Sequence, residues 1–103
     1  MQEFQSGAKS SEIKPAYDLL AVEGLRRGAV RMAEGAKTHG ARNYEQGAND
    51  PAFLADRKNH MVEHAILYAQ GDRSTDHIGA IIANACMCAR LEALAEESYG
   101  HGV

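Results

Sequence analysis

Carboxylate and imidazole side chains recur at helical spacing between residues 56 and 64. Asp56, His60 and Glu63 stand four and three positions apart, and His64 follows one turn after His60. Side chains three or four positions apart share one face of a helix, so this stripe gathers groups that can bind a metal. By itself the pattern is also typical of a solvated face supported by i,i+4 pairs. The residues that follow it in the chain favour a site.

More polar groups follow across a short connection. Asp72, Asp76 and His77 stand at the connection and at the start of the next helical segment, and Asn84 lies in an otherwise apolar stretch. A short connection makes the two helices antiparallel neighbours, and a buried Asn is costly unless it is hydrogen-bonded. We therefore expect one polar seam. Its members are Glu63, His64, Asp72, Asp76, His77 and Asn84. Mg²⁺ or Mn²⁺ prefers such carboxylates, and Mg²⁺ usually pairs with substrate phosphates.

A glycine-rich loop earlier in the chain supplies the complement to a metal and phosphate site. Lys37, Arg42 and Asn43 lie within seven residues of one another. Arg presents a planar fork to phosphate oxygens, Lys presents a point charge, and glycine lets backbone N–H groups approach. Tyr44 is expected either to stack on a base or to pack. A loop of this composition is also typical of a plain turn.

The Cys86-Met87-Cys88 stretch suggests metal or redox chemistry at first sight. On a helix, however, residues two apart differ by about 200° around the axis. The two sulfurs then point to opposite sides and cannot share a metal. We expect two small, buried apolar side chains instead.

Three helices are expected to position these residues. Apolar side chains at helical spacing predict helices over about 16–37, 51–70 and 74–97. The first stripe contains Leu19, Val22, Leu25, Ala29 and Met32; the second contains Leu54, Met61, Ala65 and Tyr68. No period-two alternation predicts a strand. The fold class is therefore all-α, with three main helices and short connections.

Local signals mark where the helices begin and end. Gly40 is expected to end the first helix, and Asp50 with Pro51 to open the second as N-cap and first-turn residue. Ser74 or Thr75 is expected to cap the third.

Two glycines four apart, Gly24 and Gly28, predict a close backbone approach on the first helix, since each helical Gly costs about 1 kcal/mol against Ala. Three thin helices leave apolar faces uncovered, so we expect a homodimer or homotetramer.

Length, net charge and hydropathy limit the classes of protein that the sequence can represent. The chain has 103 residues and allows one domain: a flexible arm over 1–14, a helical domain over 15–98 and a frayed tail over 99–103. The net charge of −3 is unlike that of a dedicated nucleic-acid binder. No apolar run approaches the ~20 residues that span a bilayer, and residues 1–7 do not resemble a signal peptide. We expect a cytoplasmic protein without a nucleic-acid polymer or membrane as partner.

The order of several short blocks carries a resemblance to a known family. The blocks run over residues 18–25, 35–47, 64–78 and 84–85. Together they resemble the small phage-type dATP/dGTP diphosphohydrolases, relatives of the MazG-like all-α NTP pyrophosphohydrolases, over about residues 15–92. The resemblance implies that a nucleoside triphosphate such as dGTP or dATP is hydrolysed to the monophosphate and pyrophosphate. It also implies Mg²⁺ or Mn²⁺ held by helical carboxylates, a dimeric or tetrameric assembly and, for a phage-encoded chain, the host cytoplasm.

On this hypothesis each singled-out residue has a role. The catalytic residues are Glu63, His64, Asp76 and His77; the metal ligands are Glu63, Asp72 and Asp76; the substrate-binding residues are Lys37, Arg42, Asn43, Tyr44 and Asn84.

The chain also departs from the family pattern. The ExxE and ExxD carboxylates of MazG-type enzymes are not present as such, Thr75 stands where an acidic residue is common, and Ala80 replaces a second histidine. These departures motivate an alternative: a catalytically weak or inactive nucleotide-binding or regulatory oligomer on the same scaffold. A purely structural helical oligomer is the third hypothesis.

Overall fold

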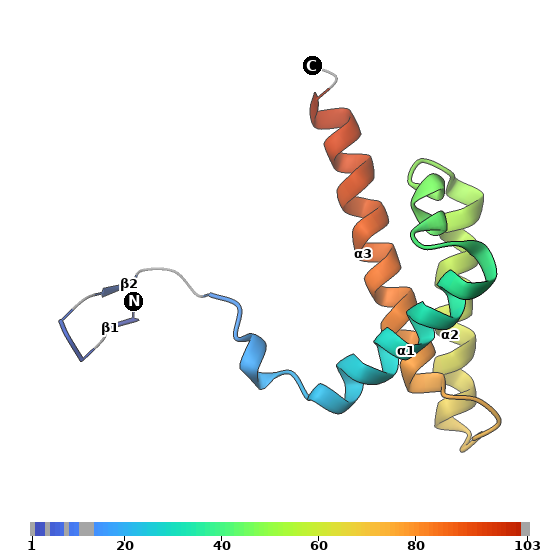
Figure 1. Ribbon diagram of the computed structural model, residues 1–103, viewed down its shortest axis with the longest axis horizontal. Helices are drawn as coiled ribbons and strands as arrows, with labels where there is room; N and C mark the ends of the chain where they lie inside the picture. Colours follow the sequence, from blue (N-terminus) through green and yellow to red (C-terminus); the bar gives the residue numbers. More distant parts are fainter. Residues whose placement is uncertain (1, 4, 8, 11–13, 102–103) are drawn as a thin grey trace.

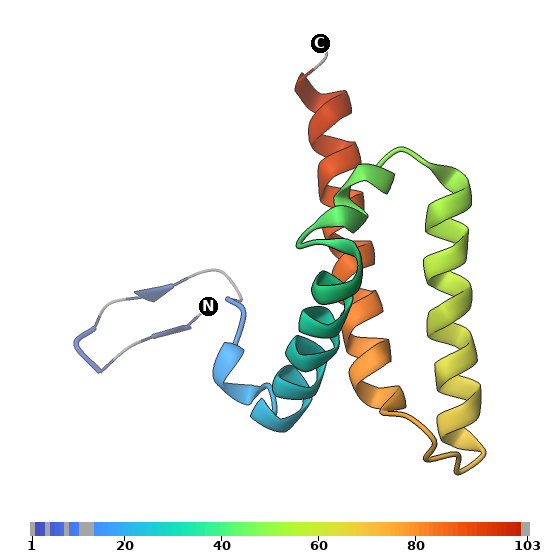
Figure 2. The same cartoon turned by 45° about the vertical axis from the view of Figure 1, so that its right-hand side comes forward.

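Three helices form the body of the protein in the computed structural model (Figure 1). They are α1 (Val22–His39), α2 (Pro51–Ala69) and α3 (His77–His101). Two short 3₁₀ helices, η1 (Tyr17–Leu19) and η2 (Asn43–Gly47), precede and follow α1. Figure 2 shows α2 and α3 running antiparallel, with α1 lying against α3. The all-α prediction is confirmed for this body.

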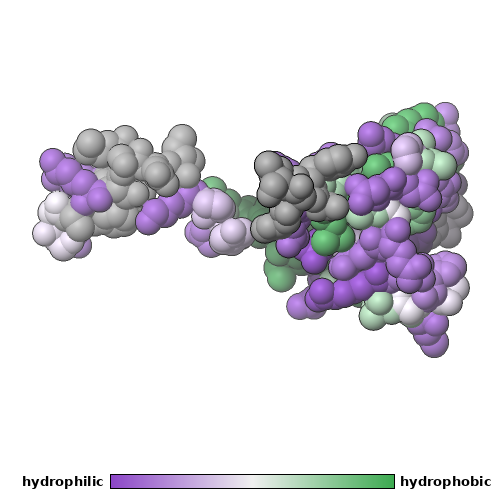
Figure 3. All heavy atoms as spheres, turned by 90° about the horizontal axis from the view of Figure 1, so that it is seen from above, coloured by the Kyte–Doolittle hydropathy of each residue, from purple (hydrophilic) through white to green (hydrophobic). Residues whose placement is uncertain are grey.

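The structure describes residues 2–3, 5–7, 9–10 and 14–101. Within the predicted arm, β1 (Gln2–Glu3) pairs antiparallel with β2 (Lys9–Ser10). The prediction that no strand forms is wrong for this pair, because two residues a side are too few to leave a period-two pattern. Figure 3 shows this segment projecting from the body, with hydrophobic surface gathered where the two join.

The first helix begins later than its apolar spacing indicated. Leu20 and Ala21 are extended, so α1 starts at Val22 and η1 stands apart from it. Gly40 ends α1 at a φ of 94°, a value that favours glycine. The predicted end at this glycine is therefore confirmed, and the predicted start at residue 16 is wrong.

The starts of the other two helices depend on aspartates. Asp50 caps α2 by accepting hydrogen bonds from the backbone N–H groups of Ala52 and Phe53, and Pro51 follows, as predicted. For α3 the predicted cap is wrong: Asp76, rather than Ser74 or Thr75, accepts from the N–H of Gly79 at 3.1 Å. The Ser74 hydroxyl instead donates to Asp72. At its other end α3 continues to His101, beyond the predicted end near residue 97.

The glycines of α1 lie directly against α3. Gly28 is buried, and a Cβ built on it would meet Cγ2 of Ile82 at 2.5 Å; at Gly24 the nearest Ile82 atom would be 3.4 Å away. The predicted close approach is confirmed. The fully buried apolar residues around it are mostly small, namely Ala80 and Ala83, with Leu91 further along α3.

The apolar stripe predicted for α1 is not the face that this helix buries, since Leu25 is exposed and α1 turns its glycine side to α3. Leu19, at 81% exposure, lies in η1. In the stripe predicted for α2, Leu54 and Met61 are half-buried and Tyr68 is exposed, and the same face also includes half-buried Arg57 and His64. Both cysteines are free, but only Cys88 is half-buried; the prediction that Cys86 is buried is wrong.

One helix has the length and composition of a membrane span, so the prediction that no apolar run approaches this length is wrong. The segment is His77–Glu97, with a mean hydropathy of 1.5. The same helix contacts both α1 and α2 and contains the buried polar residues His77 and Asn84. One such helix is weak evidence for a membrane, because the core helix of a soluble protein passes the same test.

The glycine contact predicts opposite effects for two matched substitutions. Gly28→Ala should lower the free energy of unfolding by about 1–3 kcal/mol, because the new methyl group meets a β-branched side chain. Gly35→Ala, on the same helix, has no atom within 4 Å and should raise it by up to about 1 kcal/mol. Urea unfolding followed by circular dichroism measures both; a stabilising Gly28→Ala would contradict the close approach.

Candidate functional site

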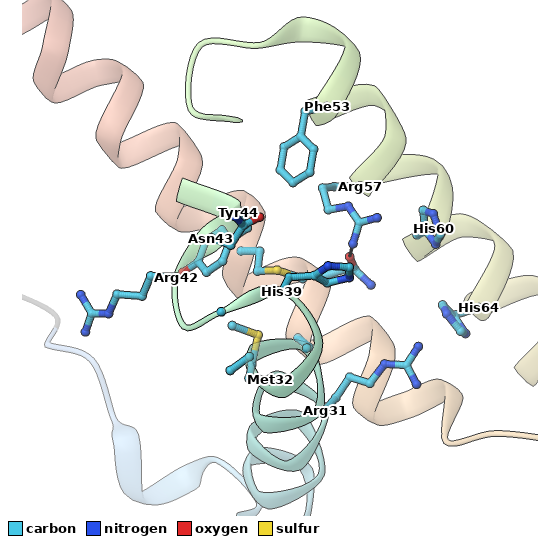
Figure 4. A pocket seen from close by; sticks show the side chains of 16 residues that line it. Arg31, Met32, His39, Arg42, Asn43, Tyr44, Phe53, Arg57, His60 and His64 are labelled. Carbon is cyan, nitrogen blue, oxygen red and sulfur yellow. Dashed lines mark hydrogen bonds between the residues drawn. The ribbon is translucent and has the colours of Figure 1, made fainter. Parts of the chain in front are cut away.

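A pocket of about 380 Å³ lies between the end of α1, η2 and α2 (Figure 4). Its walls include Arg31 and His39 from α1, Tyr44 from η2, and Arg57 from α2. Asn84 of α3 lines it as well. An ion pair at 3.5 Å between Arg90 of α3 and Glu45 helps hold η2 beside α3. The volume falls within the range of small-molecule sites.

Apart from Tyr44, the ionisable groups around the pocket are basic. Three arginines and three histidines line it: Arg31, Arg42, Arg57, His39, His60 and His64. None of the lining residues that the structure describes is Asp or Glu. Converging guanidinium and imidazole groups favour a bound anion, and phosphate oxygens suit the donor geometry of arginine.

Arg57 is held in place at the pocket wall. It donates a hydrogen bond to Oδ1 of Asn84 at 3.2 Å, and its other terminal nitrogen pairs with Asp56 at 2.8 Å. Its guanidinium lies 5.4 Å from the centre of the Phe53 ring. The Asn84 amide in turn donates to the carbonyl of Ala80 at 2.9 Å, so the buried amide is satisfied. These contacts fix one cationic group before any ligand arrives.

Two aromatic side chains also line the pocket. Figure 4 shows Phe53 and Tyr44 on the side away from Arg31 and His64. Because Arg57 lies over the Phe53 ring, the pocket combines cationic and aromatic groups, which suits a ligand with an anionic chain and a flat ring. Arg42 lies at the edge, where its guanidinium points away from the centre, is 77% exposed and lies 3.9 Å from Glu45.

A chain of hydrogen bonds links the pocket to the connection before α3. His64, at the pocket wall, faces His77 through their two Nδ1 atoms at 2.9 Å. Nε2 of His77 meets Oδ2 of Asp72 at 2.5 Å. His77 is only 2% exposed. Three of the predicted site residues are therefore brought together here.

Local contacts shift the proton affinities in this chain. Hydrogen bonds from Ser74 and then from His77 lower the pKa of the Asp72 carboxyl to about 2. Burial, followed by the positive charge of Arg31, lowers the pKa of His64. At neutral pH, Asp72 is consequently an anion and His64 is neutral.

The other expected carboxylates lie elsewhere. Asp76 is paired with Arg27 of α1 through both carboxylate oxygens, and this contact, with the N–H of Gly79, lowers its pKa to about 2. Glu63 is exposed on α2. Among the described residues, no group of three His, Cys, Asp or Glu side chains gathers as a metal site. Within one chain, the expected ligands therefore do not fit a divalent cation.

The predicted substrate-binding residues divide in the same way. Four of them line the pocket, namely Arg42, Asn43, Tyr44 and Asn84, whereas Lys37 is exposed on α1 and does not. Sequence reasoning missed Arg31, His39 and Arg57. The signal for Arg57 was present, because it continues the helical stripe that contains Leu54 and Met61.

The part of the chain that the structure describes thus combines an all-α body with a pocket lined by arginine and histidine side chains. The chain belongs to the family described as dATP/dGTP diphosphohydrolase, N-terminal, which it matches over residues 5–99. The family name implies a hydrolase, of which this match covers an N-terminal domain. No curated protein and no solved structure matches the chain.

The aspartates with lowered pKa values predict a loss of stability in acid. A carboxylate whose pKa is lower in the folded state stabilises it above the unfolded pKa, and this contribution disappears as the pH falls from about 4 to about 2. Asp76→Asn should make the urea midpoint less steeply dependent on pH in that window. Arg27→Gln should do the same, and the double variant should add little. Unchanged steepness in both single variants would contradict the pairing.

Proposed function

We propose that the protein hydrolyses a purine deoxynucleoside triphosphate, dATP or dGTP, to the monophosphate and pyrophosphate. The observation that carries this proposal is a pocket lined by arginines, with no Asp or Glu among the described wall residues, in a member of a dATP/dGTP diphosphohydrolase family. Arg31 and Arg57 would contact the phosphates. Phe53 and Tyr44 would contact the base, since aromatic faces stack on flat rings.

In the proposed reaction a water molecule attacks the α phosphorus. A bond forms between the water oxygen and the α phosphorus, and the bond from this phosphorus to the α–β bridging oxygen breaks. Pyrophosphate leaves with the electron pair of that bond. Fixed cationic donors stabilise the negative charge that develops on the phosphate oxygens, and neutral His64 can accept the proton of the attacking water.

A divalent cation enters the proposal as part of the substrate. Mg²⁺ or Mn²⁺ bound to the triphosphate keeps several of its own waters and needs few protein carboxylates. It neutralises phosphate charge and orients the nucleotide. The residues of this chain bind the anionic groups that the cation leaves free and exclude bulk water around them.

A homodimer or homotetramer is also proposed as the working form. Large apolar side chains are exposed where η1 meets α1, with Leu20 56% and Val22 58% exposed. Burying such surface in a second copy is favourable. Sedimentation at micromolar concentration should give a multiple of the 11.1 kDa chain mass, and Val22→Lys should shift it toward the monomer. A wild-type monomer at every concentration would contradict the proposal.

The proposed hydrolase activity can be tested by a direct assay. Incubation with each nucleoside triphosphate and Mg²⁺ or Mn²⁺ should release pyrophosphate and the monophosphate, fastest from dATP or dGTP. Arg31→Gln should raise KM about tenfold, because one charge-assisted contact to phosphate is lost. Arg26→Gln is the matched control, as it removes an exposed arginine of the same helix outside the pocket.

A nucleotide-binding protein without turnover is the second candidate. It is favoured by the engagement of Asp72 and Asp76 with other side chains and by the lack of a carboxylate cluster for a metal among the described residues. The same assay separates the two: calorimetric binding of dATP or dGTP without product would establish this second candidate and contradict the first.

A further inference from the structure

We propose that Asp72 is a positioning residue that orients the pocket histidine His64 through the buried His77, and that it is not a ligand for a divalent cation. The role in turnover rests on the function proposed above. The orientation itself is a property of the free protein.

The geometry forms one continuous path. Oδ2 of Asp72 meets Nε2 of His77, and Nδ1 of His77 meets Nδ1 of His64 at 2.9 Å. The two imidazole rings are tilted by 50°, with centroids 5.2 Å apart. His77 is buried and does not line the pocket, whereas His64 does. The path therefore begins at the connection before α3 and ends at the pocket wall.

The hydrogen-bond chemistry of the path permits one arrangement of protons for a neutral pair of histidines. An ionised carboxylate only accepts, so the proton of His77 is on Nε2. Nδ1 of His77 is then an acceptor, and the proton of His64 must be on Nδ1. Nε2 of His64 is left with a free lone pair. His77 contacts Nδ1 of His64, so Nε2 is the other nitrogen of a ring that lines the pocket.

One oxygen of Asp72, Oδ2, is engaged by three protein donors. The oxygen that meets His77 also accepts from the hydroxyl of Ser74 at 2.6 Å and from its backbone N–H at 3.3 Å. These contacts hold the carboxylate in the orientation that His77 requires. The other two predicted metal ligands do not form a site with Asp72, since Asp76 is paired with Arg27 and Glu63 is exposed.

The role of this chain of hydrogen bonds in the reaction depends on Nε2 of His64. A lone pair on Nε2 of His64 can accept the proton of the water that attacks the α phosphorus, while the α–β bridging bond breaks and pyrophosphate leaves with its electron pair. Asp72 and His77 do not touch the substrate. Their contribution is to select the tautomer and the ring orientation of His64.

Nitrogen NMR of the free protein tests the orientation without any turnover. In the wild type, His64 should show a protonated Nδ1 and an unprotonated Nε2, and His77 a protonated Nε2. Asp72→Ala should give mixed tautomers at both rings. A His64 proton on Nε2 in the wild type, or the same tautomers in Asp72→Ala, would overturn the proposal. The isosteric Asp72→Asn replaces Asp72→Ala where the alanine variant does not fold.

Kinetics then separate a positioning residue from a metal ligand. With saturating Mg²⁺, Asp72→Ala should lower kcat roughly 10- to 100-fold while KM stays the same. The Mg²⁺ concentration for half-maximal rate should not change; an increase would assign Asp72 to the metal and overturn the proposal. Asp18→Asn, an exposed carboxylate of η1, is the control and should behave as the wild type.

The two levels of the proposal fail in different ways. A wild-type protein that releases no pyrophosphate contradicts the proposed function, while the NMR result for His64 still decides the orientation. A wild-type protein that turns over normally but shows the opposite His64 tautomer contradicts only the role of Asp72.

Discussion

The contact between the glycine face of α1 and Ile82 of α3 controls how the other elements are arranged. Because Gly24 and Gly28 have no side chains, the backbone of α1 lies close to α3. This approach brings Arg27 beside Asp76 at the start of α3. It also directs the second half of α1 past α2, so that Arg31 faces the same space as the histidine of the neighbouring helix. The pocket is a consequence of this crossing.

The core behind the pocket is small and partly polar. His77 and Asn84 are buried among alanines, and burial without partners would cost several kcal/mol for groups of this kind. Each has partners: Asp72 and His64 for the imidazole, and Arg57 with a backbone carbonyl for the amide. The same hydrogen bonds that make burial tolerable also position the side chains at the pocket wall. Stability and site geometry therefore depend on one network.

The net charge of the chain is opposite in sign to the charge of the pocket lining. The formal charge is −3, yet the lining of the pocket is basic. This is possible because acidic side chains near it are engaged elsewhere: Asp56 pairs with Arg57 on the outer side, Asp76 pairs with Arg27, and Asp72 holds His77. An acidic overall composition argues against a polynucleotide, whose charge acts over a long surface. It does not argue against a single nucleotide in an enclosed cationic space.

Local signals in the sequence determined the three helices, the cap at Asp50, the end of α1 at Gly40 and the close approach at Gly28, because each depends on a few neighbouring residues. The family resemblance likewise placed Tyr44 and Asn84 among the residues that line the pocket. Which face of α1 turns inward was decided only by tertiary structure. Its apolar stripe predicted one orientation, but packing two backbones closely at glycine favoured another. That orientation brought Arg31 into the pocket, left Lys37 outside and placed Arg27 beside Asp76, one of the expected metal carboxylates.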